Sequence, residues 1–367
     1  MILAKKVRIY PTKEQENKLW QSVGVARFIY NWTIEREEES YLNGNKFIKN
    51  TDLRKELTLL KQTKFNWLYT VSNNVAKQAV KDACNSYINY FNCLTNKPKF
   101  KSKKKSKPSF YNDPVKLKVK SNEILLEKIG WVKIKANSLP MNTKYSNPRI
   151  SFDNKYWYIS VGIERESLTE TLNNEILGID LGIKHLAICS NNVYFPNINK
   201  TTIVKKLERR LSRLNRKFHK KYKLNKNYFT NRLRKLQRKI RLLYRRLKNI
   251  RTNYIHQITN KIVRTKPSKI IMEHLNIKGM MKKHFIAKAF AEQALYEFKR
   301  QMIYKCKLHG ITFIEADKFF PSSKICSNCG NINYNLKLSN RIYKCSCGLV
   351  IDRDLNAAIN LSRYQEN

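Results

Sequence analysis

Acidic side chains are scarce in this chain of 367 residues, which has 27 Asp and Glu against 74 Lys and Arg. Glycine and proline are also few, with 10 and 9 residues, which excludes a collagen-like or low-complexity chain. No apolar run approaches the ~20 residues that cross a bilayer, so we expect no membrane partner. The first residues lack the apolar segment of a signal peptide, which predicts a cytoplasmic protein.

The excess of basic residues gives a formal net charge of +47. Such a charge opposes compaction through self-repulsion, whereas binding phosphate groups removes that cost and releases counterions. Ribosomal and membrane-surface proteins share this composition, but we favour a nucleic acid as the partner. The length predicts two to three domains.

The first half of the chain alternates between strand and helix patterns. A strand is expected at Lys6–Tyr10, followed by a helix that begins at Thr12, because Thr12 and Gln15 form a capping-box pair. Helical patterns continue to about residue 91. Residues 97–110 interleave lysines with phenylalanines, which favours an extended, phosphate-tracking loop. Short strands between 115 and 162 then predict a small antiparallel barrel or sandwich, into which the helices are inserted.

Residues 205–251 hold 21 Lys or Arg and a single acid, Glu208. Their leucines and isoleucines recur every three or four residues, and this pattern is interrupted near residues 223–228. The spacing predicts a helical hairpin whose apolar seam joins two arms. A solvated face usually mixes charges of both signs, so these basic faces favour contact with nucleic acid.

Three acidic positions follow apolar strands or open a helix: Asp180, Glu273, and the pair Asp352 and Asp354. Burying a carboxylate is costly unless it is paired or bound to a metal, so three such positions suggest convergence. Oxygen ligands suit Mg²⁺ or Mn²⁺, and two such ions can assist phosphodiester hydrolysis. This arrangement is typical of a ribonuclease-H-like nuclease core with a five-stranded mixed sheet.

Four of the eight cysteines are clustered: Cys326 and Cys329, then Cys345 and Cys347 after fifteen residues. The spacing predicts a structural four-thiolate Zn²⁺ site, in which the second pair is the tighter C-x-C form. Glycines after Cys329 and Cys347 allow tight turns. The other cysteines are expected to be small core residues: Cys84, Cys93, Cys189 and Cys306.

Taken together, these blocks resemble the TnpB family, the OrfB-type transposon nucleases related to type V CRISPR effectors. The resemblance covers nearly the whole chain and is most specific in its last two segments. It rests on residues 10–15, 26–32, 97–110, 178–183, 272–276, 322–330 and 352–360.

The resemblance implies an α/β multidomain protein. Its core would be a RuvC-type, ribonuclease-H-like nuclease domain, formed by residues 171–321 and 350–367, with the basic hairpin at 203–255 and a zinc ribbon inserted at 322–349. A wedge-like β-barrel, residues 1–12 and 96–170, would be interrupted by a helical recognition lobe, residues 13–95.

The family's activity is RNA-guided DNA cleavage, so the implied partners are a guide RNA and target double-stranded DNA, and the implied location is the cytoplasm of a prokaryote, at the nucleoid. The family's metal-binding acids fall on Asp180, Glu273 and Asp354, which leaves Asp352 in a supporting role. Zinc would be held by Cys326, Cys329, Cys345 and Cys347. The helix that reads a short motif beside the target matches residues 71–81, where Asn74 and Gln78 share a face.

Three alternatives remain at this point: an RNA-guided repressor that does not cut, a strand-transferring or accessory transposase protein, and a ribosomal or chromatin binder. A repressor would be expected to lack at least one of the three acids, all of which are present. The last class explains the charge but not the ordered acids and cysteines. The sequence leaves open the motif, the form of the guide RNA, the cleavage pattern and whether one or two protomers act.

Overall fold

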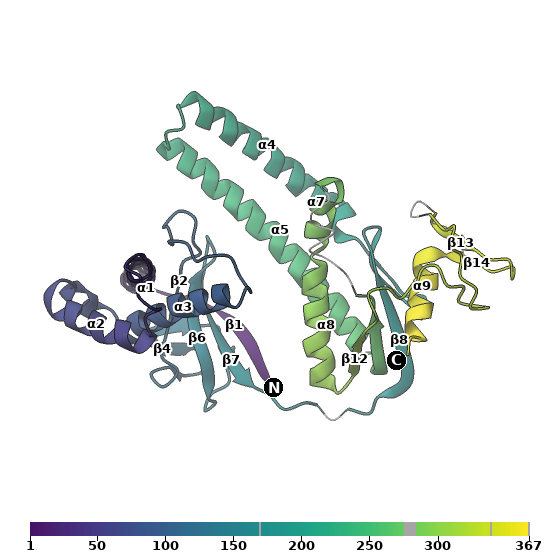
Figure 1. Ribbon diagram of the computed structural model, residues 1–367, viewed down its shortest axis with the longest axis horizontal. Coiled ribbons are helices and arrows are strands. Elements are labelled where there is room, and N and C mark those ends of the chain that lie inside the picture. The colour runs from purple at the N-terminus through teal and green to yellow at the C-terminus, as the bar shows by residue number, and fades with distance from the viewer. Residues whose placement is uncertain (169, 275–283, 338–339, 366–367) are drawn as a thin grey trace. The chain divides into compact units, whose positions relative to one another are not determined.

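The computed structural model describes residues 1–168, 170–274, 284–337 and 340–365. The chain divides into two compact units, Met1–Arg165 and Glu166–Asn367 (Figure 1). Both combine helices and strands, which confirms the α/β class. No helix in the described ranges is long and apolar enough to cross a membrane.

The first unit contains a seven-stranded antiparallel sheet in the order β2-β6-β7-β1-β5-β4-β3. The N-terminal strand lies near its centre, between β7 and β5, so the two sides of the sheet depend on the first ten residues. The strands are β1 (Ile2–Tyr10), β2 (Ser109–Tyr111), β3 (Lys118–Val119), β4 (Glu123–Leu126), β5 (Gly130–Ile134), β6 (Tyr145–Phe152) and β7 (Trp157–Glu164).

The strands expected near Lys6 and between 115 and 161 are present as β1, β3, β5, β6 and β7. The short strands β2 and β4 were not predicted. Among the described strand pairs, β2 and β3 end the order without pairing with each other, so backbone pairing does not close this sheet into a barrel.

Three helices are inserted between β1 and β2: α1 (Lys13–Leu42), α2 (Asn50–Thr63) and α3 (Asn73–Phe91), with the short 3-10 turn η1 (Asn66–Thr70) before α3. The predicted capping box is present, because the Thr12 side chain accepts from the Gln15 N–H and the Gln15 side chain accepts from the Thr12 N–H. Helices and sheet share one hydrophobic core, which includes Ile29 of α1 and Trp157 of β7. Trp20 of α1 lies at its exposed margin and packs edge-on against Trp157.

The second unit is built on a five-stranded mixed sheet in the order β10-β9-β8-β11-β12. β8, β11 and β12 pair in parallel, and β9 pairs antiparallel with both β8 and β10. A five-stranded mixed sheet was predicted here. Its strands are β8 (Asn173–Leu181), β9 (His185–Cys189), β10 (Tyr194–Pro196), β11 (Pro267–Met272) and β12 (Thr312–Glu315).

Helices pack on both faces of this sheet (Figure 1). Ile270 and Met272 of β11 share a core with α5 (Asn231–Val263) and α8 (Leu295–His309). The residue between them, Ile271, packs instead with Leu361 of α9 (Arg353–Ser362), as the alternation of a strand requires. The described part also includes η2 (Ile198–Lys200), α7 (His284–Gln293), β13 (Ile342–Lys344) and β14 (Val350–Asp352).

The helical hairpin is formed by α4 (Thr202–Leu224) and α5, with the turn at the predicted interruption. Its arms meet along the expected seam, in which Leu207 and Leu211 face Ile240, Leu243 and Leu247. The second arm continues to Val263, beyond the predicted end at residue 255.

Three of the scattered cysteines, Cys84, Cys189 and Cys306, are buried as predicted. The prediction was wrong for Cys93, which is exposed. This residue follows the C-cap of α3 and adopts a φ of 55°, so it lies in the turn beyond the helix rather than on its packed face.

Candidate active site

Two of the predicted acids lie at the carboxyl ends of adjacent parallel strands. In the β8–β11 pair, Ile179 lies opposite Met272. Asp180 and Glu273 each follow one of these partners, so the two acids come at matching positions of neighbouring chains. Residues at matching positions on parallel strands share one edge of the sheet, which brings the two carboxylates together.

The third acid is brought to this edge by an unusually close contact between α9 and β8. A Cβ at Gly178 would lie 2.0 Å from the Ala358 carbonyl oxygen and 2.4 Å from the Ser362 nitrogen, so only glycine fits there. Asp354 is one helical turn before Ala358, and Asp180 is two strand residues after Gly178. Each step covers about 6 Å, so Asp354 and Asp180 lie at similar distances from this contact.

Burial and neighbouring charges perturb Asp180 and Glu273. Burial raises the pKa of Asp180 well above its ordinary range, and the charges of Glu273 and Asp354 raise it further. Burial also raises the pKa of Glu273 to about 7, and Asp354 adds to that shift. Without a cation, buried carboxylates placed together resist ionising, and a divalent ion would remove that cost.

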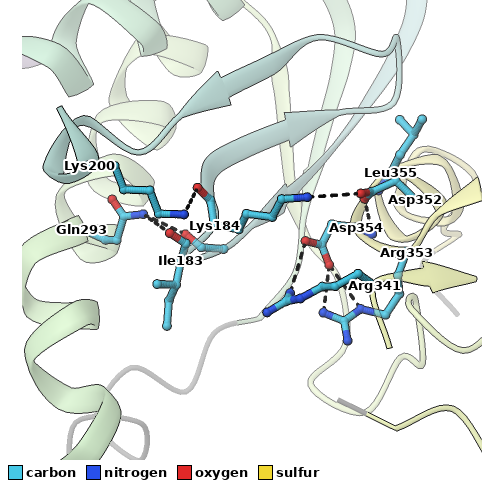
Figure 2. Close-up of polar contacts among 10 residues, drawn as sticks. Ile183, Lys184, Lys200, Gln293, Arg341, Asp352, Arg353, Asp354 and Leu355 are labelled. Carbon is cyan, nitrogen blue, oxygen red and sulfur yellow. Dashed lines mark hydrogen bonds and ion pairs between the residues drawn. The ribbon is translucent and has the colours of Figure 1, made fainter. Parts of the chain in front are cut away.

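Basic side chains compensate part of this negative charge (Figure 2). Arg353 donates to Asp354 Oδ1 at 3.0 Å, and the Arg341 guanidinium lies 3.9 Å from Asp354 Oδ2. The Lys184 ammonium lies 3.8 Å from Asp352. Sequence reasoning missed these cations, although Arg353 stands directly between two of the acids.

The lysine is carried by a turn that other side chains hold in place. Gln293, which is buried, donates to the Gly182 carbonyl at 3.0 Å, and Lys200 donates to the Lys184 carbonyl at 3.2 Å (Figure 2). The β8–β9 turn is therefore fixed beside the acids rather than left as an independent loop.

Asp352 and Asp354 have different local partners. Asp352 is the N-cap of α9, where its Oδ1 accepts the N–H groups of Asp354 at 2.9 Å and Leu355 at 3.2 Å. This carboxylate therefore caps the N-terminus of the helix. Asp354 lies inside the first turn of the helix. Within the described residues, its side-chain oxygens contact only the cations Arg353 and Arg341.

The four clustered cysteines converge as their spacing predicted. Their sulfur atoms all lie within 4.8 Å of one another, with Cys326 to Cys347 at 3.6 Å and Cys329 to Cys345 at 3.5 Å. A tetrahedral site with metal–sulfur bonds of ~2.3 Å has sulfur separations of about 3.8 Å. The Leu349 backbone N–H lowers the pKa of the Cys347 thiol to about 6, which favours the thiolate that binds metal.

Glycines follow the second cysteine of each pair and adopt left-handed conformations, with φ of 80° at Gly330 and 87° at Gly348. The predicted need for tight turns is therefore met. Across the described ranges, no other His, Cys, Asp and Glu side chains gather three ligand atoms so closely. The carboxylate oxygens of Asp180, Glu273 and Asp354 consequently lie further apart than the four sulfurs.

Two buried asparagines of α9 join this cysteine segment to the acids. Asn356 accepts from the Ser327 N–H at 3.0 Å and donates to the Ile325 carbonyl at 2.7 Å. Asn360 donates to the carbonyls of Ser322 and Ile325, each at 2.7 Å. The helix that carries Asp354 is thus pinned to the segment that carries Cys326.

A cavity of about 760 Å³ lies in the first unit, between α1, α3, the 101–109 segment and β6. Gln78 lines it and donates to Asp82 at 2.8 Å, while Asp82 forms a bidentate pair with Arg149 at 2.7 and 2.8 Å. Other basic side chains on its wall are Arg27, Lys101, Lys103 and Lys107. The residues predicted to track phosphates therefore border a recess that also holds Gln78.

Asn74, which was predicted to share the role of Gln78, is placed differently. Its side-chain amide donates to Glu127 at 3.1 Å, and Ser72, the N-cap of α3, donates to the same carboxylate at 2.5 Å. Asn74 is not among the residues that line the cavity.

Three known families match successive parts of the chain. Residues 1–46 match a family described as "Helix-turn-helix domain", residues 158–284 one described as "Probable transposase", and residues 296–361 one described as "Cas12f1-like, TNB domain". In this structure the first segment contains strand β1 and one continuous helix, α1.

Curated relatives match over almost the full length. A "Putative RNA-guided DNA endonuclease" of Streptomyces pristinaespiralis is 27% identical, with 97% of this chain and 87% of the relative aligned. A "Putative RNA-guided DNA endonuclease InsQ" of Escherichia coli K12 is 28% identical, with 97% and 90% aligned.

Two solved structures share the fold. The protein in a Cas12f1–sgRNA–target DNA complex aligns with a TM-score of 0.57 at 13% identity, covering 99% of this chain and 98% of its own. The mini-RNA-guided endonuclease CRISPR-Cas_phi3 aligns with a TM-score of 0.53 at 11% identity, covering 99% and 92%.

Proposed function

The chain is a TnpB-type protein, and from that premise we propose that it is an RNA-guided DNA endonuclease of a transposable element, which binds a guide RNA and cuts double-stranded target DNA in the cytoplasm. The observation that carries the proposal is geometric: Asp180 and Glu273 follow register partners of adjacent parallel strands, and the close contact at Gly178 packs the helix of Asp354 against the same strand. Acids are scarce in this chain, so their meeting at one edge of a sheet is unexpected unless they serve a cation.

In this proposal Asp180, Glu273 and Asp354 are the catalytic carboxylates of a RuvC-type, ribonuclease-H-like domain. They would hold Mg²⁺ or Mn²⁺, which supplies charge neutralisation and activation of water for phosphodiester hydrolysis. The chain itself positions these ligands: β8 and β11 set two carboxylates side by side, and Gly178 lets α9 bring the third. Arg353 and Arg341, which contact Asp354, are proposed to bind a phosphate of the nucleic acid beside these ligands.

The remaining features fit the same role. The cysteine cluster is proposed to hold structural Zn²⁺, which would stabilise the segment that Asn356 and Asn360 fix to α9. The basic hairpin is proposed to contact nucleic-acid backbone, since its only acid, Glu208, is paired with Arg251 at 2.7 Å. Gln78 and Asn74 are proposed to contact the DNA motif beside the target.

The test is guide-dependent cleavage of a plasmid target by the protein purified with its RNA. Asp180→Asn removes a proposed ligand with little change in shape, and we expect a loss of cleavage of about 10³-fold with unchanged RNA affinity. Glu175→Gln is the matched control, because Glu175 lies at the opposite end of the same strand. If Asp180→Asn cut as fast as the parent, the site assignment would be wrong.

The same assay separates the alternatives. A parent protein that binds target DNA with its guide but leaves it uncut in Mg²⁺ or Mn²⁺ would be a repressor. Joined products with element ends would indicate strand transfer, and we expect none.

A further inference from the structure

A second cavity, of about 590 Å³, lies in the helical part of the first unit, where the ends of α1 and α3 meet the 43–49 segment. We name it the aromatic cavity. Rings form much of its wall, and several are partly exposed, including Tyr41 and Phe91. The polar residues of its lining that carry the argument are Glu37, Glu38, Lys46, Tyr87 and Lys97.

The acids of the aromatic cavity stand out in so basic a chain. Four glutamates fall within residues 35–39, out of 27 acidic residues in all. Glu38 is paired with Lys97 at 3.1 Å. Glu37 is only 4% exposed, and no cation among the described residues forms an ion pair with it. Its carboxylate accepts the Ile48 N–H at 3.1 Å and lies 4.0 Å from the Cys84 sulfur, which leaves two of about four acceptor positions free.

A second polar group of this cavity has no partner. Tyr87 is 5% exposed, and its hydroxyl forms no hydrogen bond in the structure. Glu37 and Glu38 line the same cavity as Tyr87. Burial raises the pKa of the Tyr87 hydroxyl to about 12, and the charges of Glu38 and Glu37 raise it further. A buried hydroxyl without a hydrogen bond costs free energy, which a ligand with a matching acceptor would recover.

These groups form a pattern that one nucleobase matches best. The Watson–Crick edge of guanine presents an acceptor, O6, followed by two donors, N1–H and N2–H. Adenine, cytosine and uracil each offer at most one ring or exocyclic donor group at that edge beside their acceptors. A cavity lined by both a carboxylate and a phenol hydroxyl complements guanine, and exposed rings provide surfaces for base stacking.

We propose that the aromatic cavity binds an unpaired guanine of a nucleic-acid strand, with Glu37 accepting its N–H groups and the Tyr87 hydroxyl donating to O6. The proposal rests on the proposed function for its partner, a guide RNA or a target DNA strand. Lys46 and Lys97 on the exposed rim favour a ligand that carries phosphate over a free organic cation, which they would repel.

The experiment measures binding of fluorescent eight-nucleotide single strands to the full-length protein. The strands are oligouridylate with one central guanine, or with inosine, which lacks the N2 amino group, or with adenine. Thymidine strands with deoxyguanosine form the DNA arm. We expect the guanine strand to bind about tenfold more tightly than the other two. Whether the RNA or the DNA strand binds more tightly then shows which nucleic acid supplies the guanine.

Glu37→Gln and Tyr87→Phe should remove that preference, since each retains the shape of the side chain and loses the recognising group. Glu35→Gln is the matched control, because Glu35 is exposed on the same helix and outside the cavity. Circular dichroism melts check that each variant is folded.

Equal affinity of the parent for all three strands, a preference that persists in Glu37→Gln, or displacement of the strand by a basic peptide alone would overturn the proposal. Cleavage with guide and target is measured on the same proteins. A parent that cuts DNA without any guanine preference refutes only the cavity assignment. A parent that shows the preference but never cuts refutes only the endonuclease.

Discussion

Replacing Gly178 by alanine should separate nucleic-acid binding from cleavage. The added Cβ would lie 2.0 Å from the Ala358 carbonyl oxygen, whereas ordinary contacts begin at 3.4 Å, so α9 has to retreat by roughly 1.4 Å. Forced overpacking of this kind costs about 1–3 kcal/mol of unfolding free energy. The larger effect is on geometry, because the same helix carries Asp354 toward Asp180.

A displacement of ~1 Å at a reacting centre can reduce the rate about 100-fold, and we expect that loss in guide-dependent cleavage by Gly178→Ala. Guide-RNA affinity should change less than about twofold, since no basic surface is touched. The control is Gly182→Ala, four residues further along the chain, where a Cβ would meet the His185 carbonyl at an ordinary 3.4 Å. Equal cleavage by both variants, with normal melting curves, would refute the idea that this contact positions Asp354.

Four further outcomes test other parts of the structure. Asn360→Ala removes the donor of the buried Ser322 carbonyl and leaves the Ile325 carbonyl with Asn356 alone, which should cost about 1–3 kcal/mol in denaturant unfolding. Replacing Arg213, Lys217 and Lys220 together by alanine should weaken RNA binding and reduce the salt slope by about 2. A zinc chelator used in excess Mg²⁺ should lower cleavage and unfold the cysteine segment, with recovery when zinc is restored; full activity with no zinc detected by elemental analysis would refute the site. Burial raises the pKa of Glu37 from 4.5 to about 7, so the folded state holds a proton that the unfolded chain releases earlier. Stability should therefore fall as pH rises from about 4.5 to 7, and Glu37→Gln should flatten this dependence in thermal melts.

Features that depend on neighbours in the chain were predictable from the sequence. The capping box at Thr12 and Gln15, the interrupted seam of the hairpin and the cysteine spacing each involve residues within one or two turns or one short loop. Their physical causes are local: a helix start needs an acceptor, two helices need an apolar seam, and a thiolate site needs tight turns. The short strand β2 escaped prediction because pairing with the distant strand β6, rather than its own pattern, makes it a strand. This reason does not apply to β4, which pairs with the next strand, β5, across a tight turn.

The acids and the cations of the candidate site differ in how far the sequence reveals them. With only 27 acidic residues, an acid after an apolar strand is rare enough to be noticed, and Asp180, Glu273 and Asp354 could be proposed as a group before their positions were known. The 74 basic residues provide no such contrast, so nothing marked Lys184 and Arg341 as neighbours of the acids.

Tertiary structure brings those two cations to the acids. Lys184 lies in a turn held by Gln293 and Lys200, and Arg341 directly precedes β13, between the two cysteine pairs. The same reasoning applies to Gly178, whose requirement arises from a helix 180 residues away in sequence. In a chain whose composition is dominated by charges of one sign, residues of the rarer sign therefore indicate a candidate functional site. The common ones acquire specific roles only through the fold.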